Sequence, residues 1–127
     1  HKDIKKIILC SGKIYFDLID AREKLKKDNI IFIRIEQLYP FPIKSLVTEI
    51  KKYSKNAKFY WCQEEPKNMG AWSSVRDYIQ WTLNYIGANN KEISYIGRNE
   101  AASTATGYAK RHIAQQNKIM EEVFNNL

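Results

Sequence analysis

Short apolar segments alternate with longer amphipathic ones along the whole chain, and this alternation limits the fold more than any other feature. The apolar segments, rich in β-branched and aromatic residues, are typical of buried strands. They span residues 7–10, 30–36, 59–63 and 93–97. Helical periodicity covers residues 13–27, 42–55, 72–87 and 106–124. This order predicts an α/β three-layer sandwich, in which helices cover both faces of a mostly parallel sheet with right-handed crossovers.

Each amphipathic segment carries apolar residues at steps of three or four, which should face the core. These residues are Ile14, Leu18, Ala21 and Leu25; Ile43, Leu46, Val47, Ile50 and Tyr53; Val75, Ile79, Leu83 and Ile86; and Ala109, Ile113, Met120 and Phe124. Pro40 and Pro42 interrupt regular structure because proline lacks an N–H group and biases its predecessor away from the helical region. We expect Tyr39 to lie in a stiff, exposed loop there, and Trp61, Trp72 and Trp81 to anchor a core or an interface.

Length and charge restrict the classes of protein. The 127 residues suit one domain with one core, and no apolar run approaches the roughly 20 residues that span a bilayer. A net charge of +7 raises the possibility of an acidic partner such as nucleic acid. The lysines are spread over helical segments without an aromatic-basic motif, so a solvated surface is favoured and nucleic acid is not expected.

The cysteines and the first residue give two further expectations. Cys10 and Cys62 lie in apolar runs without CxxC or CxH spacing, which favours buried thiols in a reducing compartment over a metal or redox site. The chain begins at His1 without a Met and without a signal-like segment, so we expect a fragment of a longer protein.

The predicted topology indicates where function would lie. In open parallel sheets, ligands and partners gather at the carboxyl ends of the strands. The corresponding loops are residues 10–12, 36–42, 63–70 and 97–107. We therefore expect these four loops to share one edge of the molecule.

Four motifs carry a resemblance to a known family. They are CSGKIYFDL (10–18), RIEQLYPFP (34–42), WCQEEPKNMGAW (61–72) and, after a Gly-Arg pair and several small residues, ATGYAKRH (105–112). Together they closely resemble the C-terminal, transketolase-like domain of the thiamine-diphosphate-dependent first component of the 2-oxoglutarate dehydrogenase complex. The resemblance covers nearly the whole chain from Ile7 onward. One departure follows Arg98, where NEAAST (99–104) stands in place of a run similar to PASASP that is usual in the family. The spacing to Tyr108 is unchanged, so we expect the topology to be kept.

The resemblance implies that this chain is part of a larger enzyme and is inactive alone. By this resemblance, the parent enzyme would decarboxylate 2-oxoglutarate on thiamine diphosphate and pass the succinyl group to lipoyl on the dihydrolipoyl succinyltransferase component, in the citric acid cycle. Thiamine diphosphate and magnesium lie on two other domains in this family, so no catalytic, cofactor or metal residue is expected here. Implied partners are the other domains of the chain, a homodimer mate and an acyl-CoA or nucleotide effector. The compartment would be a bacterial cytoplasm or the mitochondrial matrix.

Eight residues are candidates for interdomain or effector contacts. They are Gln63, Glu64, Glu65, Gly70, Trp72, Arg98, Tyr108 and Arg111. Adjacent Glu64 and Glu65 could form an acid–base pair, but neighbours on a strand point to opposite sides, which favours capping, a domain contact or a salt bridge.

Three other positions keep open alternatives. Gly70 fits either a turn that needs positive φ or a backbone anion site. Arg98 fits an interdomain ion pair better than a clamp for a phosphate or carboxylate. For His112, on an amphipathic helix, we expect a surface or interface position and no acid–base role.

Two rival functions remain open at this point. One is the C-terminal domain of another thiamine enzyme, from the pyruvate dehydrogenase or transketolase branch. The other is a free-standing basic binding module, whose affinity for polyanions would fall steeply with salt.

Overall fold

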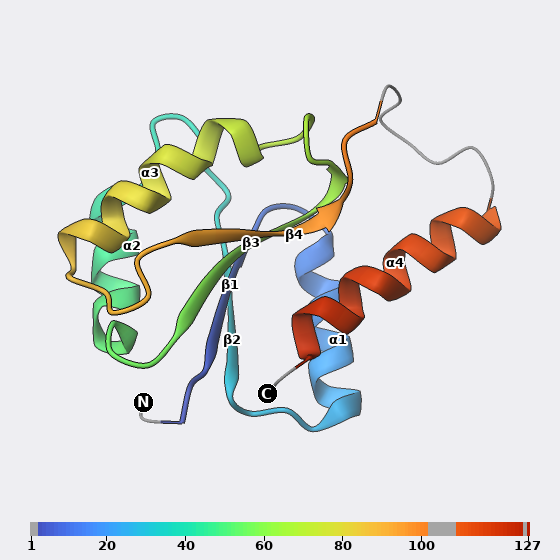
Figure 1. Ribbon diagram of the computed structural model, residues 1–127, viewed down its shortest axis with the longest axis horizontal. Helices are drawn as coiled ribbons and strands as arrows, with labels where there is room; N and C mark the ends of the chain where they lie inside the picture. The colour runs from blue at the N-terminus through green and yellow to red at the C-terminus, as the bar shows by residue number, and fades with distance from the viewer. Residues whose placement is uncertain (1–2, 102–108, 126) are drawn as a thin grey trace.

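Four parallel strands form one sheet in the order β2-β1-β3-β4 in the computed structural model, which describes residues 3–101, 109–125 and 127 (Figure 1). The strands are β1 (Lys6–Cys10), β2 (Ile30–Arg34), β3 (Lys58–Pro66) and β4 (Ile93–Arg98). All three neighbouring pairs are parallel, and β1 lies between β2 and β3 in register. The predicted α/β class with a parallel sheet is confirmed.

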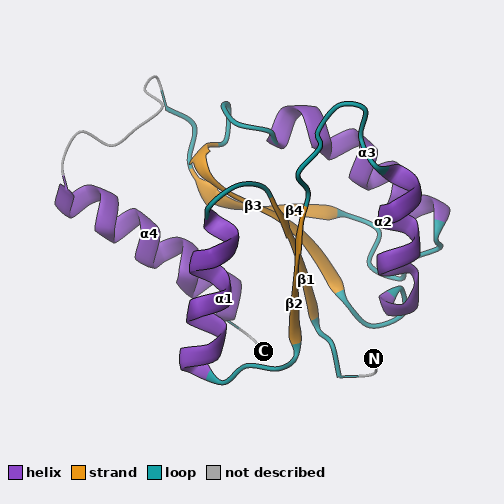
Figure 2. Cartoon of the chain, turned by 180° about the vertical axis from the view of Figure 1, so that it is seen from behind, coloured by secondary structure: helices purple, strands orange, loops and turns teal. Residues whose placement is uncertain are grey.

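Helices cover both faces of this sheet, as the alternating sequence pattern predicts. They are α1 (Ile14–Leu25), α2 (Ile43–Ile50), followed by the 3₁₀ turn η1 (Lys51–Tyr53), α3 (Trp72–Tyr85) and α4 (Ala109–Phe124). The α2 and α3 helices lie on one face, and α1 and α4 lie on the other (Figure 2). Among the described residues, no helix is long and apolar enough to cross a membrane.

The inner strand β1 contributes side chains to two cores, because successive residues of a strand point to opposite faces. Ile7 and Leu9 belong to the core under α2 and α3, together with Trp61 and Trp72. Ile8 and Cys10 belong to the core under α1 and α4. These four of the five residues of β1 are fully buried, which explains why residues 7–10 form a continuous apolar run.

Several predicted positions need correction. The β2 strand ends at Arg34 and not at Glu36, whereas β3 continues to Pro66, so that Glu64 and Glu65 belong to a strand. Leu25 and Ile113 were expected in the core and are exposed. Leu25 lines an open hollow between the ends of α1 and α4, and the first turns of α4 project beyond the sheet (Figure 1). Ile119 and Val123 fill the core in place of Ile113.

Candidate functional site

The loops after β1, β2 and β3 enclose an open hollow at the carboxyl edge of the sheet, with a volume of about 630 Å³. Its lining includes Ser11 and Gly12 after β1, Leu38 and Tyr39 after β2, Gln63, Glu65 and Gly70 at the end of β3, and Ala71, Ser74 and Tyr78 near the start of α3. The loop after β4 joins the same edge, because the Asn68 side chain donates to the Ala101 carbonyl and accepts from its N–H. The predicted meeting of loops at one edge is confirmed for their described residues.

Gln63 holds this edge together from inside. Its side chain is buried, and Oε1 accepts hydrogen bonds from Trp61 Nε1 at 2.9 Å and from the Trp72 backbone N–H at 3.0 Å. Nε2 donates to the carbonyls of Met69 at 2.7 Å and Pro66 at 2.9 Å, with a longer contact to a third carbonyl at Glu65. Two donors on one side and carbonyls on the other fix the orientation of the amide. One side chain thus ties the end of β3 to the following turn and to the first residue of α3.

Gly70 allows this turn to close over Gln63. Its φ of +67° lies in the left-handed region, which favours glycine. A Cβ atom at this position would lie 3.1 Å from both amide atoms of Gln63 and from Glu65 Cβ. The turn explanation of Gly70 therefore has direct geometric support, since both the backbone angle and the close approach require a residue without a side chain.

Glu64 and Glu65 alternate along β3 as neighbours on a strand must. Glu64 is half-buried and forms a salt bridge with Lys13, whose Nζ lies 3.0 Å from Oε1. The hydrogen bond to Glu64 raises the pKa of Lys13, burial lowers it, and the charges of Glu64 and Asp17 raise it again. The net effect is a raised pKa. The Glu65 side chain is exposed, while its carbonyl accepts hydrogen bonds inside the edge. Glu64 therefore has a lysine partner on the α1 side, separate from Glu65.

Tyr95 is a second support of this edge, and it is not among the residues that the sequence motifs indicated. Its hydroxyl donates to the Arg98 carbonyl at 2.8 Å and approaches the Glu65 carbonyl at 3.2 Å, while its ring packs on Trp72 at 5.4 Å between centroids. Burial raises the pKa of Tyr95 to about 12. A Cβ atom on Gly97 would approach the Gln63 carbonyl to 2.7 Å, so this glycine lets β4 pass close to β3. The tyrosine two residues before a glycine, at a strand end, is the only sequence signal of this contact.

The remaining candidates do not all reach this hollow. Arg98, at the end of β4, lines a separate cavity of about 170 Å³ together with Gln115 and Lys118 of α4. Arg111 and His112 are exposed in the first turns of α4. Tyr108 lies outside the described residues. The structure thus brings Gln63, Glu64, Glu65, Gly70 and Trp72 together and leaves Arg98 beside them in its own cavity.

Reactive thiols and metal ligands are not features of this edge. Cys10 and Cys62 are fully buried, and burial raises the pKa of Cys10 to about 12 and that of Cys62 further. A thiol with a raised pKa is a poor nucleophile at neutral pH. Within residues 3–101, 109–125 and 127, no group of three His, Cys, Asp or Glu side chains could hold a metal ion.

Comparisons with known proteins agree on one family. The family model described as "2-oxoglutarate dehydrogenase C-terminal" matches residues 1–124. The 2-oxoglutarate dehydrogenase E1 component of Brucella anthropi is 46% identical over 123 residues, which is 97% of this chain and 12% of that protein. The Brucella ovis protein of the same name is 47% identical over 119 residues, 94% of this chain and 12% of that protein. The chain therefore spans about an eighth of the length of these relatives.

A solved structure supports the fold. The structure titled "Split gene transketolase, inactive beta4 tetramer" has a TM-score of 0.62 with this chain at 14% identity. The match covers 94% of this chain and 38% of that one. At this level of identity the similarity establishes the transketolase-like fold and nothing about activity.

Proposed function

Because this chain belongs to the 2-oxoglutarate dehydrogenase C-terminal family, we propose that residues 1–127 form the single C-terminal domain of a longer, multidomain 2-oxoglutarate dehydrogenase of the succinyl-transferring type. Its role would be assembly and regulation. The longer enzyme would decarboxylate 2-oxoglutarate on thiamine diphosphate and deliver succinyl to the lipoyl group of a dihydrolipoyl succinyltransferase. In line with the bacterial relatives, its compartment would be a bacterial cytoplasm, with the mitochondrial matrix as the alternative.

The observation that carries this proposal is the internal use of the polar groups at the carboxyl edge. Gln63 is committed to five contacts within the edge, and Glu64 is paired with Lys13. Such groups hold a loop in shape and are not poised to transfer protons. We assign thiamine diphosphate and magnesium to other domains of the enzyme, because the internal pairing of Gln63 and Glu64 leaves neither side chain to hold a cofactor. We expect the 127-residue chain alone to be inactive.

In this proposal the end of β3 and its turn are a joint. Glu65, Lys67, Asn68 and Gly70 are exposed at the edge of a strand whose inner side is fixed by Gln63. A rigid inner side and an exposed, charged outer side suit the polar rim of a contact with another domain or with the homodimer mate, where charges contribute specificity. Glu64, through its salt bridge to Lys13, would keep the start of α1 in line with this joint.

The joint can be tested in the full-length enzyme with Glu64→Gln and Glu65→Gln, alone and together. The control is Glu49→Gln, an exposed carboxylate on α2. We expect the dimer dissociation constant to rise by about fivefold or more for the double variant, the equivalent of about 1 kcal/mol, with decarboxylation assayed by an artificial electron acceptor retained. Loss of decarboxylation with normal assembly and cofactor affinity would instead assign these carboxylates to the chemistry.

Arg98 suggests a second contact of the same domain. It lines a small cavity with Lys118 and Glu100, so two cations and one anion give this cavity a net positive formal charge, which favours an anionic group. We propose an ion pair with another domain here, and as the alternative the phosphate of an acyl-CoA or nucleotide effector. Calorimetric titration of the full-length enzyme and its Arg98→Met variant with acetyl-CoA and with AMP separates the two. Binding that is lost in the variant favours the effector, whereas no heat in either protein favours the ion pair.

A further inference from the structure

The α3 helix exposes three aromatic rings along one side. Tyr78 is 41% exposed, Trp81 is 51% exposed and Tyr85 is 66% exposed. The three positions follow at steps of three and four, so they lie on one face of the helix. We call Tyr78, Trp81 and Tyr85 the aromatic ridge. Exposed aromatic side chains that are contiguous mark interaction surfaces more often than isolated ones do.

Contacts within the surface hold the ridge in a fixed shape. Trp81 and Tyr85 are stacked, with ring centroids 5.1 Å apart and an angle of 11° between planes. Tyr78 is stacked on the buried Phe41 at 5.2 Å and 7°. Tyr39, 88% exposed, lines the carboxyl-edge hollow together with Tyr78. The ridge is therefore continuous with the edge that contains the proposed joint, and its rings are preorganised for contact.

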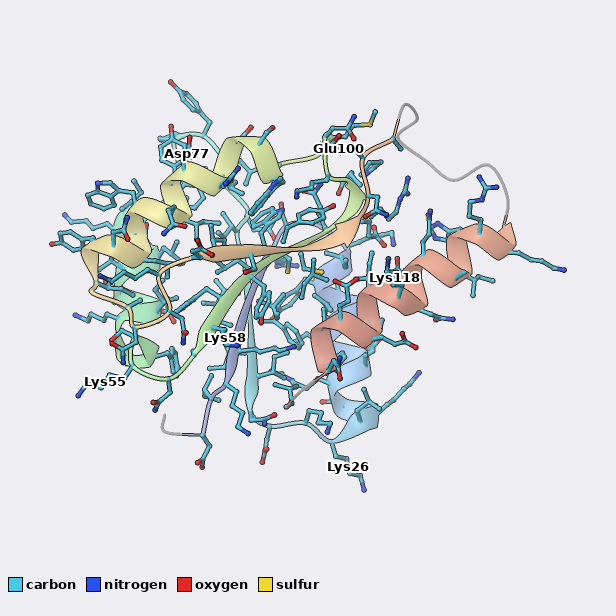
Figure 3. The ribbon with its side chains drawn as sticks, in the orientation of Figure 1. Lys26, Lys55, Lys58, Asp77, Glu100 and Lys118 are labelled. Atoms are coloured by element: carbon cyan, nitrogen blue, oxygen red, sulfur yellow. The ribbon has the colours of Figure 1, made fainter. Side chains whose placement is uncertain are left out.

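The charge of α3 differs from that of the rest of the chain. Trp72–Tyr85 contains one cation, Arg76, and one anion, Asp77, so its formal charge is zero, whereas the whole chain carries +7. Asp77 lies on the outer side of α3 in Figure 3, and the labelled lysines lie on other elements. Enrichment in Tyr and Trp with depletion of Lys is the composition of the core of a protein–protein interface.

The size of the surface indicates what kind of partner covers it. Four aromatic rings of roughly 150–250 Å² each, on average about 60% exposed, offer about 500 Å². A stable complex of free proteins usually buries about 800 Å² on each partner. The ridge with Tyr39 is therefore small for an interface between two separate copies. It suffices when a covalent connection supplies a high effective concentration.

The family relatives supply such a connection, since this chain spans only 12% of their length. Ile4, close to the N-terminal end of the described chain, packs against the core under α2 and α3. Preceding polypeptide would thus arrive on the α2 and α3 side of the sheet. We propose that the aromatic ridge, extended by Tyr39, is the surface on which the preceding part of the same polypeptide docks through an uncharged, apolar surface. This inference rests on the proposed function, because it requires that the chain belong to a longer enzyme.

Hydroxyl-radical footprinting with mass spectrometry tests the docking surface. The oxidation rates of Trp81 and Tyr85 are measured in the full-length enzyme and in the 127-residue chain, which contains both hydrophobic cores and serves as the reference. Phe16 on α1, 56% exposed on the opposite face, is the matched control. We expect oxidation of Trp81 and Tyr85 to slow by about tenfold in the full-length enzyme, with Phe16 changed by less than about twofold. Equal rates for Trp81 in both proteins would overturn the proposal.

A second measurement distinguishes docking of the preceding polypeptide from docking of a second copy of the chain. The footprint of the 127-residue chain is repeated at rising protein concentration, alongside sedimentation. If Trp81 becomes protected as the chain dimerises, a second copy covers the ridge and the tethered partner is wrong. In the full-length enzyme, Trp81→Glu should speed proteolytic release of this domain by about tenfold, whereas Phe16→Glu should not. Decarboxylase activity is assayed separately, so that its absence would refute the proposed function without affecting the footprint.

Discussion

At the scale of single residues, Gly70 and Gln63 form one unit. We expect Gly70→Ala to lower the free energy of unfolding by about 2–3 kcal/mol, since the new Cβ atom has an unfavourable φ and presses on the Gln63 amide. Gly87→Ala is a matched control, because Gly87 has the same φ of +67° and no atom within 4 Å of an added Cβ. Urea unfolding of the 127-residue chain measures both. Equal losses for the two variants would mean that the contact with Gln63 contributes nothing.

Tyr95 should make stability sensitive to alkaline pH. Its pKa is about 12 in the folded chain and near 10 when unfolded, so the folded state holds a proton that the unfolded state releases. The stabilisation is complete below pH 10 and is lost as the pH rises from 10 to 12. Tyr95→Phe removes this contribution, and the difference between wild type and variant should shrink by up to about 1.4 kcal/mol per pH unit in that range. A difference that stays constant to pH 12 in urea unfolding would contradict this assignment.

The sequence predicted that the loop after β3 lies at the functional edge, and its motif supplied the candidates Gln63, Glu64, Glu65, Gly70 and Trp72. It could not predict that Gln63 is the buried hub, since glutamine usually lies on the surface and its partners depend on the path of the turn. Tyr95 and Asn68 were missed for a similar reason. Glu65, a partner of Tyr95, and Ala101, the partner of Asn68, lie about 30 residues away in the sequence, and these contacts exist only after β3 and β4 pair.

At the scale of elements, Lys6 fastens α4 to the sheet. Its side chain is buried, and Nζ donates to the carbonyls of Glu122, Val123 and Asn125 at 2.7–3.1 Å. A cation at the C-terminal end of a helix also interacts favourably with the helix dipole. We expect Lys6→Met to lower the free energy of unfolding by about 2 kcal/mol and to increase hydrogen exchange in α4 more than in α3.

The register partner of Lys6 supplies the control for that variant. Lys58 lies directly beside Lys6 on β3, is exposed, and its charge, after burial, lowers the pKa of Lys6. The Lys58→Met variant removes a repulsive charge and should leave exchange in α4 unchanged or slower. Faster exchange in α4 for both variants would indicate a general effect of losing a lysine, and the specific fastening by Lys6 would be wrong.

Element types and order followed from periodicity, because a chain with alternating buried strands and amphipathic helices has few ways to bury its apolar surface. The residues at which the elements end could not be predicted from periodicity. The β3 strand reaches Pro66 only because it pairs again with Arg98 after a shift in register, a contact between residues distant in sequence. Ile113 has the correct spacing for a core residue but is exposed in the first turns of α4. Figure 1 shows that this end of the helix extends beyond the sheet, which the periodicity of the sequence does not reveal.

At the scale of the whole molecule, two cores share one sheet. Residues of β1 and β3 alternate between the core under α2 and α3 and the core under α1 and α4. One core could lose its packing alone only if the sheet stayed intact without one of its helical layers. A parallel sheet is normally buried on both faces, so we do not expect it to stay intact with one face uncovered. This geometry predicts a single cooperative unfolding transition.

Val123→Ala tests the cooperativity, because Val123 is fully buried in the core under α1 and α4 while all three tryptophans belong to β3 or α3. Removal of its methyl groups should lower the free energy of unfolding by about 1–2.5 kcal/mol. If the sheet couples the cores, tryptophan fluorescence should detect the full loss, although the substitution lies on the opposite face. Ile113→Ala, at an exposed position of the same helix, should leave the midpoint in place. An unchanged fluorescence midpoint for Val123→Ala, with earlier loss of helical circular dichroism, would show that α4 detaches first and that the two layers are separate units.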